Sequence, residues 1–158
     1  MLRFILTLVI FLVGCGYKPV NFDKNKLNIC VEKVFINSPE PTVLDILNRD
    51  VRDAVLAHGE HLDCSYKKNV ILNLSLKSIS FYPIGYSESQ RANVYKIYMN
   101  LNLKIKDKEG NTLLNKDIVE TTQYVGAGLR ADIERRYAIE NLGKLIQVRI
   151  FSLLNELK

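Results

Sequence analysis

The stretch that decides the fold of this chain is Tyr95-Lys96-Ile97-Tyr98-Met99-Asn100-Leu101-Asn102-Leu103-Lys104-Ile105-Lys106. The aliphatic side chains recur at every second position, and polar side chains or Tyr98 occupy the positions between them. Because successive side chains of a strand point to opposite sides, this alternation predicts a long strand with one buried face and one wet face. The chain should therefore contain an antiparallel sheet that is covered on one side only.

Two strands are expected on either side of this stretch. A hairpin turn, Asp-Lys-Glu-Gly-Asn at 107–111, leads into a strand from about Thr112 to Tyr124. Upstream, a strand from about Asn69 to Tyr82 should end at Pro83, and residues 84–92 should form a loop.

The remaining segments complete an α+β pattern. A first strand with a phase slip is expected at 27–36. Helical periodicity predicts a helix over 42–58, ended by Gly59, and a long helix over 131–157. The order β-α-β-β-β-α predicts a two-layer sandwich, in which a four-stranded, mainly antiparallel sheet carries two helices on one face.

The N-terminal residues have the pattern of a bacterial lipoprotein signal. An apolar run begins at Phe4 behind the cationic Arg3 and ends before Cys15. This run is too short to cross a bilayer core, which needs roughly 20 residues, and it has the length of a signal-peptide core. Leu12 three positions before the cysteine and Gly14 directly before it match the lipobox, the signal for cleavage and lipid attachment.

The lipobox predicts how the chain is divided. Residues 1–14 should be a signal peptide, 15–26 a lipidated tether and 27–158 a single domain. Acyl chains such as palmitate on Cys15 would anchor the protein to a membrane that it does not span. Gly16, in place of an aspartate, favours the periplasmic side of the outer membrane. An ordinary secretory signal with an incidental cysteine is the alternative.

Two further cysteines, Cys30 and Cys64, have two open interpretations. The oxidising periplasm would allow a disulfide between them, and a loop of about 35 residues would then stabilise the fold by roughly 3–4 kcal/mol. The alternative is a pair of buried free thiols, since sequence alone does not give the distance between the two Cα atoms.

Composition and motifs argue against catalysis. The formal net charge of +5 suits an anionic partner without requiring one, and nucleic acid is not expected outside the cytoplasm. No nucleophile–base set, G-x-S-x-G motif or paired carboxylates stand out, so we expect neither an enzyme nor a cofactor.

Two short motifs have structural explanations. The segment 58–61, His-Gly-Glu-His, lacks zinc-protease spacing and is interpreted as a solvated helix end, with no metal expected. The segment 126–131, Gly-Ala-Gly-Leu-Arg-Ala, matches a dinucleotide fingerprint, but no second parallel strand follows it. Its glycines are expected to form the turn between sheet and helix.

The wet face of the sheet is the candidate binding surface. Four lysines should project from it, together with Tyr98 and several asparagines, and Arg91 lies at the approach to the strand. The four are Lys77, Lys96, Lys104 and Lys106. They could neutralise phosphates, and a merely solvated strand face is the alternative.

Several segments together resemble one protein family. They are the start Leu12-Val13-Gly14-Cys15-Gly16-Tyr17 with Lys18-Pro19, then Arg91-Ala92-Asn93-Val94 before the long strand, residues 107–114, and Tyr124 before the last helix. In this order they resemble the lipopolysaccharide-assembly lipoproteins of the LptE family.

The resemblance implies a fold and a function. LptE proteins have two helices on a four-stranded sheet, plug the lumen of the outer-membrane β-barrel LptD, and bind lipopolysaccharide on its way to the outer leaflet. The resemblance makes Arg91 the nearest basic candidate for ligand contact. The four lysines are candidates only because the strand pattern places them on the wet face. Activation of a peptidoglycan synthase, or a role as accessory subunit of another lipid-transport system, is the alternative. A tether of only about ten residues favours a partner at the membrane.

Overall fold

The computed structural model describes residues 26–36, 41–65 and 67–157, so the expected signal peptide, Cys15 and the tether up to residue 25 lie outside the described residues. The elements in chain order are β1 (Asn28–Ile36), α2 (Pro41–Ala57), β2 (His61–Leu62), β3 (Val70–Tyr86), β4 (Ala92–Asp107), β5 (Thr112–Val125), α3 (Ala131–Leu154) and the 3-10 turn η1 (Asn155–Leu157).

The strands of the described residues form one sheet of five, in the order β2-β1-β3-β4-β5. The long strands β3, β4 and β5 pair antiparallel, whereas β1 pairs parallel with both β2 and β3. The expectation of four mainly antiparallel strands is therefore wrong in number and only partly right in direction. The reason is the crossover through α2, which returns the chain so that β3 enters beside β1 in the same direction.

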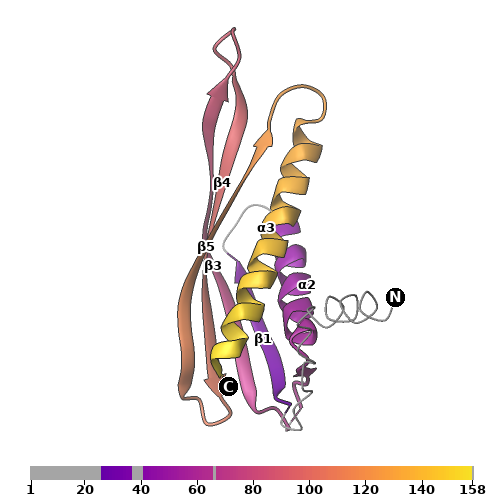
Figure 1. Ribbon diagram of the computed structural model, residues 1–158, viewed down its shortest axis with the longest axis vertical. Helices are drawn as coiled ribbons and strands as arrows, with labels where there is room; N and C mark the ends of the chain where they lie inside the picture. Colours follow the sequence, from indigo (N-terminus) through magenta and orange to yellow (C-terminus); the bar gives the residue numbers. More distant parts are fainter. Residues whose placement is uncertain (1–25, 37–40, 66, 158) are drawn as a thin grey trace, which may run out of the picture.

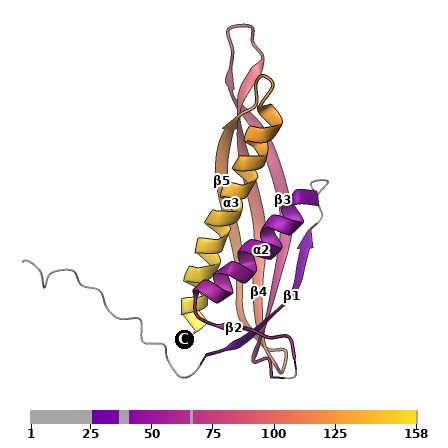
Figure 2. The ribbon, with the colours of Figure 1, turned by 90° about the vertical axis from the view of Figure 1, so that its right-hand side faces the viewer.

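Both helices lie on one side of the sheet, and this confirms the predicted two-layer α+β arrangement (Figures 1 and 2). The alternating apolar residues of β4 are fully buried between the two layers, and their polar neighbours face the other way. These buried residues are Ile97, Met99, Leu101, Leu103 and Ile105. The two helices contribute the facing apolar side chains, among them Leu47, Val51, Ile139, Leu142 and Ile146.

Strand β3 continues past the point where the sequence predicted its end. It runs through Pro83 to Tyr86, with register shifts between Pro83 and Gly85 and between Gly85 and Tyr86. Beyond Leu76, β3 no longer pairs with β1, so this part is an edge where bulges make proline tolerable. The expected loop over 84–92 is thus shorter than predicted, since residues 84–86 and Ala92 belong to strands, and the β3–β4 hairpin projects beyond the start of α3 (Figure 1).

Two other features complete the domain. A disulfide joins Cys30 in β1 to Cys64 just after β2, with 4.5 Å between the Cα atoms. The last helix ends at Leu154 and is followed by η1, so its regular part is shorter than the predicted 131–157. Within the described ranges, no helix has both the length and the apolar character needed to cross a bilayer.

Candidate functional site

The sheet face opposite the helices carries a shallow hollow of about 450 Å³. Its lining comes from three neighbouring strands, because Ser80 pairs with Tyr98 across β3 and β4, and Asn100 pairs with Val119 across β4 and β5. The lining residues are Ser78, Ser80, Tyr82, Ile84, Tyr98, Asn100 and Val119. The hollow therefore combines two aromatic rings with hydroxyl and amide groups.

The two tyrosines have a defined mutual geometry. The rings of Tyr82 and Tyr98 meet edge to face, with centroids 5.5 Å apart and planes at 83°. The Nζ of Lys96 lies 5.0 Å from the centroid of the Tyr98 ring, within the range of a cation–π contact. An ammonium group is thus held beside an exposed aromatic surface.

Sequence reasoning missed most of this hollow. Of its lining it named only Tyr98 and Asn100. The other lining residues were not predicted to lie on this face, because a register shift between Leu76 and Ser78 brings Ser78, Ser80 and Tyr82 onto it. A signal was present in the sequence, since Ile79 and Phe81 take over the apolar phase after Ser78. The amide oxygen of Asn100 is buried and has no hydrogen-bond partner among the described residues.

Lys77 does not act as an independent cation on this face. Its Nζ donates to both carboxylate oxygens of Asp117, at 2.8 and 2.9 Å, and Asn102 Nδ2 donates to the same carboxylate at 2.8 Å. The hydrogen bond from Lys77, and after it the one from Asn102, lowers the pKa of Asp117 below its ordinary value. The charges of Lys77 and Asp117 therefore largely cancel.

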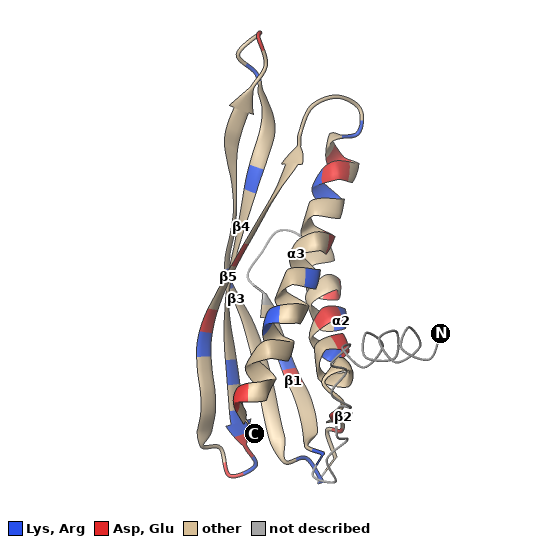
Figure 3. Ribbon diagram, in the orientation of Figure 1, with Lys and Arg blue, Asp and Glu red and all other residues tan. Residues whose placement is uncertain are grey.

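The other predicted cations do not form one cluster. Lys104 pairs with Asn73 and Asn115, and Lys106 lies near the same end of β4, far from Lys96. Eight residues separate Lys96 from Lys104, which corresponds to roughly 27 Å along a strand. Arg91 lies at the far tip, where its backbone bonds to Ser87. Figure 3 shows the basic residues of the sheet spread along the strands and not gathered in a patch.

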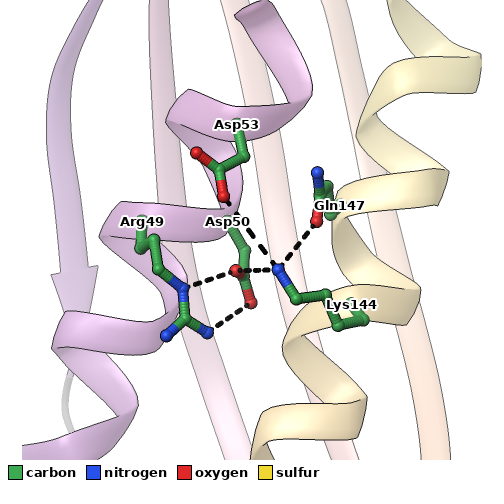
Figure 4. Close-up of polar contacts among 5 residues, drawn as sticks. All are labelled: Arg49, Asp50, Asp53, Lys144 and Gln147. Atoms are coloured by element: carbon green, nitrogen blue, oxygen red, sulfur yellow. Dashed lines mark hydrogen bonds and ion pairs between the residues drawn. The ribbon is translucent and has the colours of Figure 1, made fainter. Parts of the chain in front are cut away.

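An ion pair between a buried carboxylate and a half-exposed lysine joins the two helices behind the sheet (Figure 4). Asp50 of α2 is fully buried. Its Oδ1 accepts hydrogen bonds from Arg49 Nε at 2.9 Å and from Lys144 Nζ of α3 at 3.0 Å. The hydrogen bond to Asp50 raises the pKa of Arg49. Gly143 makes this approach feasible, since a Cβ there would lie 2.1 Å from Asp50 Oδ2. The cluster is structural, and sequence reasoning did not single it out.

The expected solvated helix end at 58–61 is wrong for His58 and Glu60. The side chain of His58 is 4% exposed, with Nδ1 3.2 Å from Glu60 Oε1 and Nε2 2.9 Å from Asn155 Oδ1. The other oxygen of Glu60 accepts the backbone N–H of Leu27 at 2.5 Å. These bonds tie the start of the described domain to the ends of both helices. In the described part of the chain, no three potential ligands gather as a metal site would require.

The glycine motif at 126–131 serves packing and a turn. A Cβ on Gly126 would lie 2.5 Å from the ring of Tyr95, and Gly128 has a φ of +78°, which favours glycine. Both glycines therefore let the chain leave β5 and enter α3 at close range.

No family model and no curated protein matches the sequence. Among solved structures, the fold is similar to rare lipoprotein B from Shewanella oneidensis, with a TM-score of 0.59, 11% identity, and 81% of this chain and 94% of that chain covered. A protein of Helicobacter pylori, described as a homologue of a neuraminyllactose-binding haemagglutinin, has a TM-score of 0.55 at 14% identity, covering 82% of each chain.

A third similar structure comes from Caulobacter crescentus CB15 and is described as a lipoprotein. It has a TM-score of 0.53 and 19% identity, with 79% of this chain and 92% of that chain covered. At such identities the likeness establishes a shared fold. Because one fold can carry many functions, what the chain does has to be argued from its own residues.

Proposed function

We propose that this protein is an outer-membrane lipoprotein, anchored through Cys15 on the periplasmic side, which binds lipopolysaccharide and plugs an LptD-type β-barrel. Three observations support the proposal. The sequence carries a lipobox, its motifs in order resemble the LptE family, and its fold is similar to structures described as lipoproteins. An anchor built on several acyl chains holds a protein stably at a membrane surface.

The observation that carries the proposal is the uncovered face of the sheet. Both helices cover the opposite face, so β3, β4 and β5 present a long surface of hydroxyl, amide and lysine side chains with an aromatic hollow. Such a surface suits a ligand that is both anionic and rich in hydroxyl groups, as the phosphates and sugars of lipopolysaccharide are.

The binding would be electrostatic in part and at a wet surface. Lys96 beside the hollow and Lys104 with Lys106 at the other end would contact separate anionic groups of one elongated ligand, and Arg91 would add a contact at the tip. Lys77 would contribute less, because Asp117 already neutralises it. Charge pairing at an exposed surface is screened by ions, so the affinity should fall as salt rises.

A charge-reversal variant tests the ligand part of the proposal. Lys96→Glu, Lys104→Glu and Lys106→Glu together should weaken lipopolysaccharide binding at least about tenfold, because three attractive contacts become repulsive. The matched control changes Arg52, Arg130 and Arg136 to glutamate, since these exposed cations lie on α2 or at the start of α3, on the other side of the sheet. Equal binding by both triple variants, at unchanged circular dichroism, would remove the open face from the proposal.

Isolation of the complex tests the partner. The full chain should co-purify with a large β-barrel from detergent-solubilised outer membranes, and Cys15→Ser should abolish incorporation of labelled palmitate. Recovery of a penicillin-binding protein in place of a barrel would favour activation of a peptidoglycan synthase.

A further inference from the structure

The hollow on the open face has the composition of a sugar-binding site. Its volume of about 450 Å³ is within the range usual for small-ligand pockets. Tyr82 is 53% exposed and Tyr98 38% exposed, so both rings offer surface to a ligand. Ser78 and Ser80 add hydroxyl groups to the lining of the hollow.

This arrangement matches the two chemical sides of a sugar ring. One side of a pyranose presents C–H groups, which pack on an aromatic face, and its rim carries hydroxyl groups, which exchange hydrogen bonds with serine and tyrosine hydroxyls. The rings of Tyr82 and Tyr98 meet at 83°, so they form a corner with two walls. A corner of this kind can fix the orientation of a ring that a single flat tyrosine would leave free to rotate.

The charges at the hollow favour an acidic sugar over a neutral one. Lys96 Nζ lies over the Tyr98 ring at the rim, and none of the described carboxylates forms an ion pair with it. Asp117, the carboxylate on the open face of β5, is held by Lys77 and Asn102 and so exerts little repulsion. The net positive charge at the rim complements a carboxylate or phosphate on the bound sugar.

We infer that Tyr82, Tyr98 and Lys96 form a subsite for one acidic sugar residue of the lipopolysaccharide saccharide. The inference rests on the proposed function, and it adds the part of the ligand that is recognised and the place where it binds. The sugar ring packs in the corner of the two tyrosines, and its anionic group pairs with Lys96. The acyl chains take no part in this contact.

The test uses the lipidated full chain in detergent and the lipid-free core oligosaccharide of lipopolysaccharide as the probe. Nuclear magnetic resonance should show shifts concentrated on the second half of β3 and the first half of β4, around Tyr82 and Tyr98. Tyr98→Leu and Lys96→Gln should each weaken binding by about three- to tenfold, because each removes one contact at a partly wet site. Tyr98→Phe keeps the ring and should change the affinity less than Tyr98→Leu.

The control is Lys116→Gln, which removes the same charge from the neighbouring strand β5 at a position that pairs with the buried Leu103 and so lies on the other face of the sheet. It should leave oligosaccharide binding unchanged, and a neutral oligosaccharide of equal length should bind wild type weakly.

Three results would overturn the inference. Oligosaccharide binding that is insensitive to Tyr98→Leu and Lys96→Gln, in a protein that still binds whole lipopolysaccharide, would refute the subsite and leave the proposed function standing. Equal binding of acidic and neutral probes would refute the role of Lys96. If the wild type bound no lipopolysaccharide but bound a peptidoglycan fragment through Tyr98 and Lys96, both the proposed ligand of the subsite and the proposed function would be refuted.

Discussion

The close contact between the two helices predicts that Gly143→Ala lowers stability, the opposite of the usual effect of such a substitution. Gly143 lies inside α3 opposite Asp50 and Ile46 of α2. Replacing a helix-interior glycine by alanine normally stabilises a protein by about 1 kcal/mol, because alanine loses less backbone entropy. At Gly143 we expect the opposite, since an added Cβ would lie 2.1 Å from Asp50 Oδ2 and 2.5 Å from Ile46 Cγ2.

The magnitude follows from two opposing effects. Overpacking costs about 1–3 kcal/mol, and displacing the buried Asp50 weakens its pairing with two half-exposed cations, which adds a part of the about 3–5 kcal/mol that complete loss of a fully buried pair would cost. Subtracting the propensity gain leaves a net loss of about 2–3 kcal/mol in the free energy of unfolding. With a urea dependence of about 1–3 kcal/mol per molar, the midpoint should fall by about 1 M.

Urea denaturation followed by circular dichroism measures this loss. Asn141→Ala, an exposed position on the same helix, should change stability by no more than about 0.5 kcal/mol. In an Asp50→Ala background, Gly143→Ala should cost less, because one of the two clashing groups is gone. A Gly143→Ala protein as stable as wild type, or more stable, would show that the helices do not approach as described.

Three further predictions concern other parts of the fold. Reducing the Cys30–Cys64 bond, which closes a separation of 34 residues, should lower the free energy of unfolding by about 3 kcal/mol in denaturation with and without reductant. Because the folded pKa of Asp117 is lowered, its contribution is present above about pH 4 and is lost as pH falls through the folded value, so Asp117→Asn should flatten stability curves measured in acid. His58→Leu leaves the buried Glu60 without its imidazole partner and should lower the melting temperature, whereas His61→Leu, at an exposed position, should not.

Strand β4 could be predicted because its signal is local. Alternation from Tyr95 to Lys106 reflects one buried face, and a buried face leaves its mark on every second residue. By contrast, β2 has two residues, too few to show any period, and its pairing with β1 depends on the path of the chain through α2. The mixture of parallel and antiparallel pairing in the sheet therefore could not be predicted from the local sequence pattern.

The candidate site, like the fold, could be predicted only in part. The open face could be predicted from the polar phase of β4, including the positions of Lys96, Tyr98 and Asn100. The pairing of Lys77 with Asp117 could not, because it joins strands separated by 40 residues in sequence across a bulge. Asp50 did carry a signal, since it lies three residues after Leu47 and four before Ala54, on the apolar face of its helix.

We propose above that the uncovered sheet face binds lipopolysaccharide at the outer membrane. Photo-crosslinking in living cells tests it most directly, with a photoreactive residue placed at Tyr98 on the open face or at Val148, which is 67% exposed on α3. We expect lipopolysaccharide to be crosslinked at position 98, with little or none at position 148. Crosslinks of equal yield at both positions, or at position 148 alone, would contradict it.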